Sequence, residues 1–346
     1  MSIYFAAQYN GLWSIGPFFG ENQLVPKTIS PHLQELRSLA GQPDEQKRLA
    51  VTLLNPRLGN EVIFSALQIL QRGPPPEARP ALLALYAHYA QGSKTRDPAA
   101  NLRAAILRAL RTIVIPADLP LLTTAVETYV FPPPSFKEEG ASLRSAALNA
   151  LNEVDETLAR FHAIRLLANE HTDPMSGEPA LSAAHLLAAL GEQTALYFYV
   201  MQDGARTLPE VLSEALRHLI AVPEAMLPGL IARYSQSEQE VVLVGLFDLL
   251  IHHRSGPHQL DLLAGFLRTS QQLAAYRYLA TVLLTSGHKV LIEELLAAAK
   301  AENRRDQLLI LIDVLALLPA APAVQRVRQE LQERLLSAGH GPAFNR

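Results

Sequence analysis

The residues best suited to metal or acid–base chemistry are histidines with carboxylates nearby in the chain. In the stretch DLLIHHRSGPH, Asp248 and His252 are spaced i, i+4, and His253 and His258 follow. On a helix this spacing places two potential metal ligands on one face. The same stretch also fits the polar end of a helix, where histidines and Arg254 interact favourably with the helix dipole before Ser-Gly-Pro ends it. We favour the helix end and predict no metal site.

A second group of polar residues could line a small pocket of a lyase or hydrolase. His162, His171 and Asp173 are the candidates, and Glu178 follows them within the stretch NEHTDPMSGEPA. Covalent or acid–base catalysis requires a nucleophile and a base within hydrogen-bond reach of each other. No spacing in the sequence compels such a pair, so we predict no catalytic residue and no cofactor.

Sequence motifs for nucleotide binding or hydrolysis are missing. The fragment GSKT at 92–95 resembles the end of a phosphate-binding loop, but Ser93 separates the glycine from Lys94 and no strand precedes it. GxGxxG, GxSxG and HExxH do not occur. The chain has no cysteine, which excludes thiol nucleophiles, disulfides and cysteine-ligated metals.

The composition is typical of a globular chain. The net charge does not indicate a strongly charged surface for binding a partner. The 30 basic and 33 acidic residues give a net charge of −3, which does not favour nucleic acid. The N-terminal stretch lacks the features of a signal peptide, and the longest apolar runs are interrupted by Asp248 and Asp313. We therefore expect a cytoplasmic protein that does not cross a membrane.

The elements that would position these residues are short helices that recur along the chain. The stretches LRAAILRAL (102–110) and LRSAALNAL (143–151) are nearly the same sequence, and LSAAHLLAALG follows at 181–191. Leu102, Ile106, Ala109, Leu110 and Ile113 follow the spacing of an apolar helix face. Similar patterns recur with a step of about 30 to 40 residues, the length of two antiparallel helices with their turns. Prolines between the patterns mark helix boundaries.

These Ala-rich first helices resemble the HEAT-like repeat family, in its bacterial variety, over residues 31–335. The resemblance implies an all-α fold, an α-solenoid of about eight to nine antiparallel helical pairs, with the second helices on the concave face. Such repeats scaffold, bind proteins or DNA, and occasionally catalyse. The repeated His-Glu dipeptides of the deoxyhypusine hydroxylases do not occur in this sequence. No stretch matches the repeat-type alkylpurine DNA glycosylases or the phycobiliprotein lyases convincingly.

Three insertions between consecutive units suggest a binding surface. They lie at 89–101, 129–142 and 169–180, each after a second helix and before the next first helix. Equivalent positions of stacked repeats lie side by side, so we expect the insertions to form one ridge, although tolerated loop extensions are the alternative. The expected anchors for a partner protein are aromatic and basic residues: Tyr89, Lys94, Arg96, Tyr129, Phe131, Phe136 and Lys137.

An alternative function is DNA or RNA binding by a basic stripe across successive repeats. The candidate residues are Arg103, Arg108, Arg111, Arg144, Arg160 and Arg165. Acidic residues at 153, 155 and 156 interrupt this stripe, and the first helices are expected on the convex side.

The ends of the chain differ from its middle. Residues 1–30 contain the only tryptophan and an Asn10-Gly11 pair flanked by apolar runs, which is typical of a β-hairpin. We expect this aromatic segment to cap the first repeat, with a docking surface as the alternative, and residues 336–346 to form a loose tail. Taken together, the sequence predicts a non-enzymatic protein-interaction scaffold or adaptor.

Overall fold

The chain is built entirely of helices in the residues that the structure describes. The computed structural model describes residues 30–202, 207–255, 259–319 and 321–338, and no β-strand occurs in these ranges. The predicted aromatic hairpin or cap at 1–30 lies outside them, except for Ser30. The all-α prediction is confirmed for the described part of the chain.

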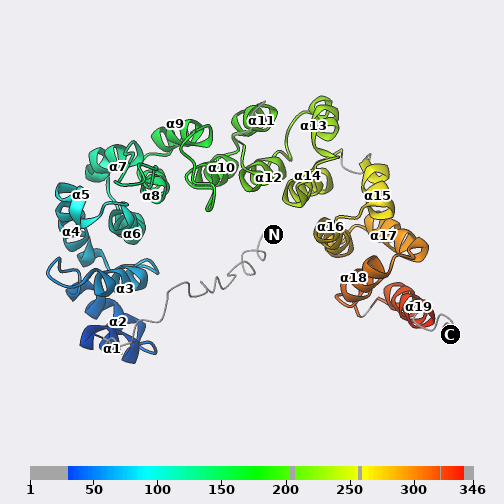
Figure 1. Ribbon diagram of the computed structural model, residues 1–346, viewed down its shortest axis with the longest axis horizontal. Coiled ribbons are helices and arrows are strands. Elements are labelled where there is room, and N and C mark those ends of the chain that lie inside the picture. Colours follow the sequence, from blue (N-terminus) through cyan, green and yellow to red (C-terminus); the bar gives the residue numbers. More distant parts are fainter. Residues whose placement is uncertain (1–29, 203–206, 256–258, 320, 339–346) are drawn as a thin grey trace.

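The helices follow a curved arc in two rows (Figure 1). The arc begins with α1 (Pro31–Ser38), α2 (Pro43–Thr52) and α3 (Asn60–Leu70). The inner row contains α6 (Asn101–Leu110), α8 (Ala141–Asn152), α10 (Ala180–Ala189), α12 (Pro209–Arg217), α14 (Glu240–His252), α16 (Leu273–Thr285) and α18 (Arg305–Leu315). The outer row contains α4 (Arg79–Gln91), α7 (Leu119–Val126), α9 (Glu156–Leu167), α11 (Gln193–Met201), α13 (Leu227–Tyr234), α15 (Leu260–Thr269), α17 (Lys289–Ala301) and α19 (Pro322–Ala338).

Each inner helix packs against the next inner helix along the arc, from α6 to α18. One continuous cluster of buried apolar side chains runs from Leu33 to Leu331, so the core extends along the whole array. Small residues allow the closest approaches: a Cβ at Gly245 of α14 would lie 2.4 Å from the Ser213 carbonyl oxygen of α12.

Local sequence explains where these helices start and stop. Prolines occupy the first turn of several helices, among them Pro31, Pro120, Pro209 and Pro228, where the missing N–H costs no helical hydrogen bond. Gly191 ends α10 in the left-handed region at φ +74°, and its N–H donates to the carbonyl of Ala188. The prolines therefore act as helix boundaries, as the sequence predicts.

Two expectations about the arrangement are wrong. The stretches LRAAILRAL and LRSAALNAL form α6 and α8, which lie on the inner side of the arc, so the first helices and not the second helices line the concave side (Figure 1). The last helix continues to Ala338, so the tail expected at 336–346 is wrong for its first three residues, and residues 339–346 lie outside the described ranges. None of the helices in the described ranges combines the length and the apolar character that a membrane span needs.

Candidate partner-binding site

Two of the three predicted insertions meet in space. The first is the loop at 127–140, between α7 and α8, and the second is the loop at 168–179, between α9 and α10. The rings of Tyr129 and Phe131 each pack edge-to-face on His171, with centroids 5.5 Å apart, and the Asn169 side chain donates to the Tyr129 hydroxyl. We call these two loops the ridge, because side chains of one loop contact side chains of the other.

A buried arginine holds both loops of the ridge to the inner helix α8. The side chain of Arg144 is fully buried, and its two terminal nitrogens lie 2.6 and 2.8 Å from the two carboxylate oxygens of Glu138. The same guanidinium donates to the carbonyls of Thr128 and His171, one from each loop. Its carbon lies 4.3 Å from the centre of the Tyr129 ring. Charge-assisted bonds of this kind fix geometry, so they hold the bases of the two loops against α8.

The ridge exposes large apolar side chains despite this order. Phe131 is 46% exposed, Phe136 68% and Met175 89%, and Lys137 is also exposed. Phe136 adopts φ +50°, a left-handed conformation that is unfavourable for an aromatic residue. Asp173 shapes the second loop by accepting hydrogen bonds from the backbone N–H groups of the two residues before Gly177.

The insertion at 89–101 does not supply the aromatic anchor that the sequence predicts. Tyr89 is only 2% exposed, and its hydroxyl donates to the side-chain oxygen of Asn60, so it is a core residue and the prediction for it is wrong. The insertion folds into the short helix α5 (Ser93–Arg96), where Lys94 and Arg96 are exposed and Arg96 donates to the carbonyl of His88. Tyr129 is half-buried within the ridge.

The six arginines of the alternative nucleic-acid surface do not form an open stripe. Arg103 is buried and its Nε lies 3.1 Å from the carboxylate of Asp97, just as Arg144 is buried against Glu138. For these two residues the prediction of a contact surface is wrong, because each binds an acid six positions earlier in the chain.

The other four arginines remain nearer the surface but are mostly engaged. Arg111 pairs with Glu153 at 3.3 Å, and Arg160 pairs with Glu156 and Glu192. Arg165 donates to the Val126 carbonyl and the Tyr129 hydroxyl, whereas Arg108 is exposed. The surface charge of the stripe is therefore largely balanced.

The histidines considered above as catalytic or metal-binding candidates have structural partners. His162 is buried beside Arg165, and burial followed by this positive charge lowers the pKa of its imidazole. In the helix-end stretch, His252 bonds the Asp248 carbonyl and His253 lies 2.8 Å from the Val222 carbonyl, while His258 is outside the described residues. Within the described ranges, no group of three or more histidine or carboxylate side chains is arranged to hold a metal ion.

Sequence reasoning missed a polar network that joins four inner helices. The carboxylate of Glu214 on α12 accepts from His185 of α10 at 3.0 Å and from His218 at 2.8 Å. Arg217 links Glu214 to Asp248 of α14, which also binds the Tyr278 hydroxyl of α16. Only the Glu214–Arg217 and Glu214–His218 spacings of i, i+3 and i, i+4 give a signal in the sequence, because the other pairs join residues 29 to 31 positions apart.

Burial and the contacts within this network shift the pKa values of its titratable groups. Burial raises the pKa of Glu214, but hydrogen bonds from His185 and His218, together with the Arg217 charge, outweigh it and hold that pKa far below its usual range. The hydrogen bond to Glu214 raises the pKa of His185. Burial raises the pKa of Asp248 against the opposing effect of the Tyr278 hydroxyl. This network stabilises the packing of the inner helices. The imidazole of His185 and the guanidinium of Arg217 remain partly exposed on the inner row.

Comparisons with known proteins do not identify a family. No family model matches the chain, and no curated protein matches it. A crystal structure of an engineered protein is similar at 14% identity, with 88% of this chain and 91% of that chain covered and a TM-score of 0.38. That score is too low to carry an argument about fold or function.

Proposed function

We propose that the chain is a non-enzymatic interaction scaffold that binds a protein partner through the ridge. In this proposal the helices form a HEAT-like α-solenoid of nine pairs, from α1/α2 to α18/α19, in a cytoplasmic protein. The stacking of inner helix on inner helix and the continuous buried core support this architecture. A long and rigid surface of near-neutral charge suits association with another protein.

The observation that carries the proposal is the side chain of Phe136. It is 68% exposed and has an unfavourable backbone conformation, yet it lies in a loop that is tied to a fully buried arginine. Strained conformations persist where the surrounding structure imposes them, and they concentrate at functional sites. An aromatic side chain on a loop whose ends are already held in place requires little further ordering of the backbone on binding, which favours it as an interface anchor.

The nucleic-acid alternative receives less support. Arg103 and Arg144 are buried, and three of the other four candidate arginines have protein partners. Binding through phosphates requires exposed cations and weakens steeply with salt. Retention of nucleic acid that disappears with nuclease and added salt would favour this alternative.

Site-specific photocrosslinking tests the proposal. Benzoylphenylalanine is placed at Phe136 or, as a matched control, at Phe161 of the outer helix α9, because both side chains are 68% exposed. We expect a discrete, nuclease-insensitive protein adduct in native cells from position 136 and none from position 161. Equal adducts from both positions, or none from position 136, would contradict binding through the ridge.

A further inference from the structure

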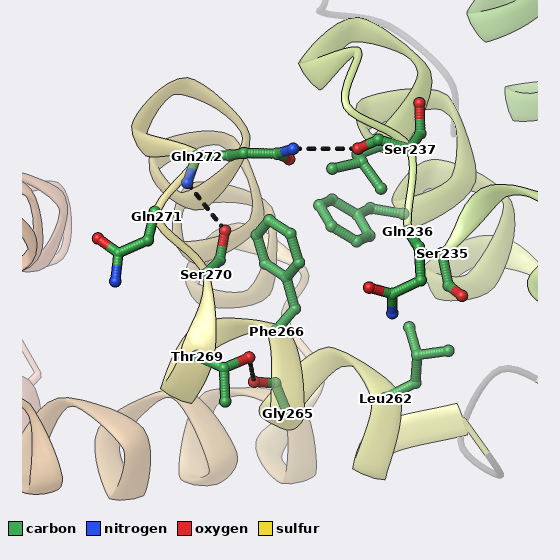
Figure 2. Close-up of a pocket in the computed structure, with 12 residues that line it drawn as sticks. Ser235, Gln236, Ser237, Leu262, Gly265, Phe266, Thr269, Ser270, Gln271 and Gln272 are labelled. Carbon is green, nitrogen blue, oxygen red and sulfur yellow. Dashed lines mark hydrogen bonds between the residues drawn. The ribbon is translucent and has the colours of Figure 1, made fainter.

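A cavity lies between two turns near the C-terminal part of the arc (Figure 2). One wall is the turn at 235–237, which leads from α13 into α14, and the other is the turn at 270–272, which leads from α15 into α16. The volume is about 560 Å³, which lies within the range of small-molecule and side-chain pockets. Figure 2 shows Phe266 between the two turns and the Gln272 side chain reaching across to Ser237.

The base of the cavity is apolar. Leu243 and Phe247 of α14 are almost fully buried, and the Phe247 and Phe266 rings pack edge-to-face with centroids 4.8 Å apart. The Gln272 side chain donates to the Ser237 carbonyl at 3.0 Å and fixes the two walls relative to each other. Leu262 and Phe266, which also line the cavity, are half-buried, and they offer the apolar surface that an aliphatic or aromatic group can contact.

The rim of the cavity is polar but carries no charge. The lining residues nearest solvent are serine, threonine and glutamine, including the exposed side chains of Gln236 and Gln271. Hydroxyl and amide groups both donate and accept hydrogen bonds, which matches the N–H and C=O groups of a peptide. None of the lining residues is charged, so an ionised group would lose its hydration without gaining a counter-charge.

The cavity lies in the same type of turn as the ridge. Both are formed by connections from an outer helix to the next inner helix. Arg144 bonds the His171 carbonyl, Gln272 bonds the Ser237 carbonyl, and Arg304 bonds the Ser270 carbonyl. Connections of the same kind therefore form both the ridge and the cavity.

We propose that this cavity binds an uncharged apolar side chain, with its flanking peptide groups, from an extended segment of the partner protein. The apolar side chain contacts Leu262 and Phe266, which are only half-buried, and the rim amides pair with the peptide groups. The inference rests on the proposed function, because it takes the occupant to be part of a polypeptide partner.

The test compares two small probes that differ in charge. N-acetylphenylalanine amide and N-acetylphenylalanine have the same ring and differ in a terminal amide against a carboxylate. We expect the amide to bind the full chain about ten-fold more tightly, as measured by NMR titration. Equal affinity for the two probes, or no binding of the amide, would overturn the inference.

A pocket-filling variant locates the binding. Gly265 lines the cavity, and a Cβ at this position meets no atom within 4 Å, so Gly265→Leu fills the space without a clash at the backbone. The matched control is Gly229→Leu on α13, where a Cβ also meets nothing within 4 Å and which does not line the cavity. We expect Gly265→Leu to weaken amide binding about ten-fold or more and Gly229→Leu to leave it unchanged. Equal binding by both variants would overturn the inference.

Failure of this inference is distinguishable from failure of the proposed function. If position 136 crosslinks a partner and the amide does not bind, the cavity inference alone is wrong. If the amide binds in the cavity and position 136 gives no adduct, the ridge proposal is wrong.

Discussion

Replacement of Arg144 by methionine should release the ridge from the inner row. The variant removes a buried cation that donates to both carboxylate oxygens of Glu138, and the Glu138 side chain is itself only 6% exposed, so water compensates little for the loss. Removal of one partner from a buried ion pair costs about 3–5 kcal/mol, since the remaining charge loses its counter-ion. The carbonyls of Thr128 and His171 also lose a donor. We therefore expect a local destabilisation of about 3–5 kcal/mol.

Native-state hydrogen exchange is the suitable assay. Helical arrays of this kind unfold in local units, so a single global transition would hide the effect. The informative amides are those of Val130 and Gly140, which both donate to the Glu138 carboxylate. Their protection should fall in Arg144→Met, together with that of the loop at 168–179.

A control and a double variant make the prediction specific. Arg277→Met removes an exposed pair with Asp313 at 3.3 Å and should cost less than about 1 kcal/mol. Combining Arg144→Met with Glu138→Gln should restore part of the lost protection, because no unpaired charge remains. A loss for Arg144→Met as small as that for Arg277→Met would refute the argument that this pair holds the ridge.

Three further predictions concern packing, pH and the ridge. Gly245→Ala should destabilise the chain by about 1–3 kcal/mol because its Cβ overlaps the neighbouring inner helix, whereas Gly229→Ala should be neutral or stabilise by up to about 1 kcal/mol; urea unfolding measures both. His185→Gln should remove a stabilisation that is present at pH values below the ordinary histidine pKa and is lost as pH rises through the raised pKa of His185; thermal melts from pH 5 to 8 measure it. Phe136→Ala should change stability by less than about 0.5 kcal/mol, measured by thermal unfolding, while adduct formation from neighbouring ridge positions disappears.

Each of these three predictions would be contradicted by a specific result. Equal stabilities of the two glycine variants would show that α12 and α14 separate without cost. A difference in melting temperature between His185→Gln and the parent that stays constant with pH would show that the raised pKa of His185 does not contribute to stability. A large stability loss in Phe136→Ala would place this ring in the core.

Much of the fold could be predicted because helix periodicity and proline positions act locally. The recurring Leu and Ala positions of 102–110 and 143–151 indicated α6 and α8, and Pro120 and Pro209 marked helix starts. Which row faces the inside of the arc could not be predicted, since it depends on how all pairs stack. The periodicity of one helix shows only which face packs.

The candidate site was predicted only in part for a related reason. The adjacency of the insertions at 129–142 and 169–180 followed from repeat geometry, and contacts of Tyr129 and Phe131 with His171 bear it out. The burial of Arg103 and Arg144 was not predicted, because arginine is rarely fully buried unless it is paired with an acid. Their acids, Asp97 and Glu138, each lie six residues earlier, and this repeated spacing is the signal that could have revealed them.

The most direct test of the scaffold proposal is the affinity of the crosslinked partner for three proteins. The dissociation constant is measured for the parent chain, for Phe131→Ala with Phe136→Ala, and for a control pair of exposed outer-helix residues, Phe161→Ala with Phe198→Ala. We expect the ridge variant to bind at least about 100-fold more weakly and the control to bind as the parent does. Unchanged affinity in the ridge variant, or an equal loss in the control, would contradict a partner site on the ridge.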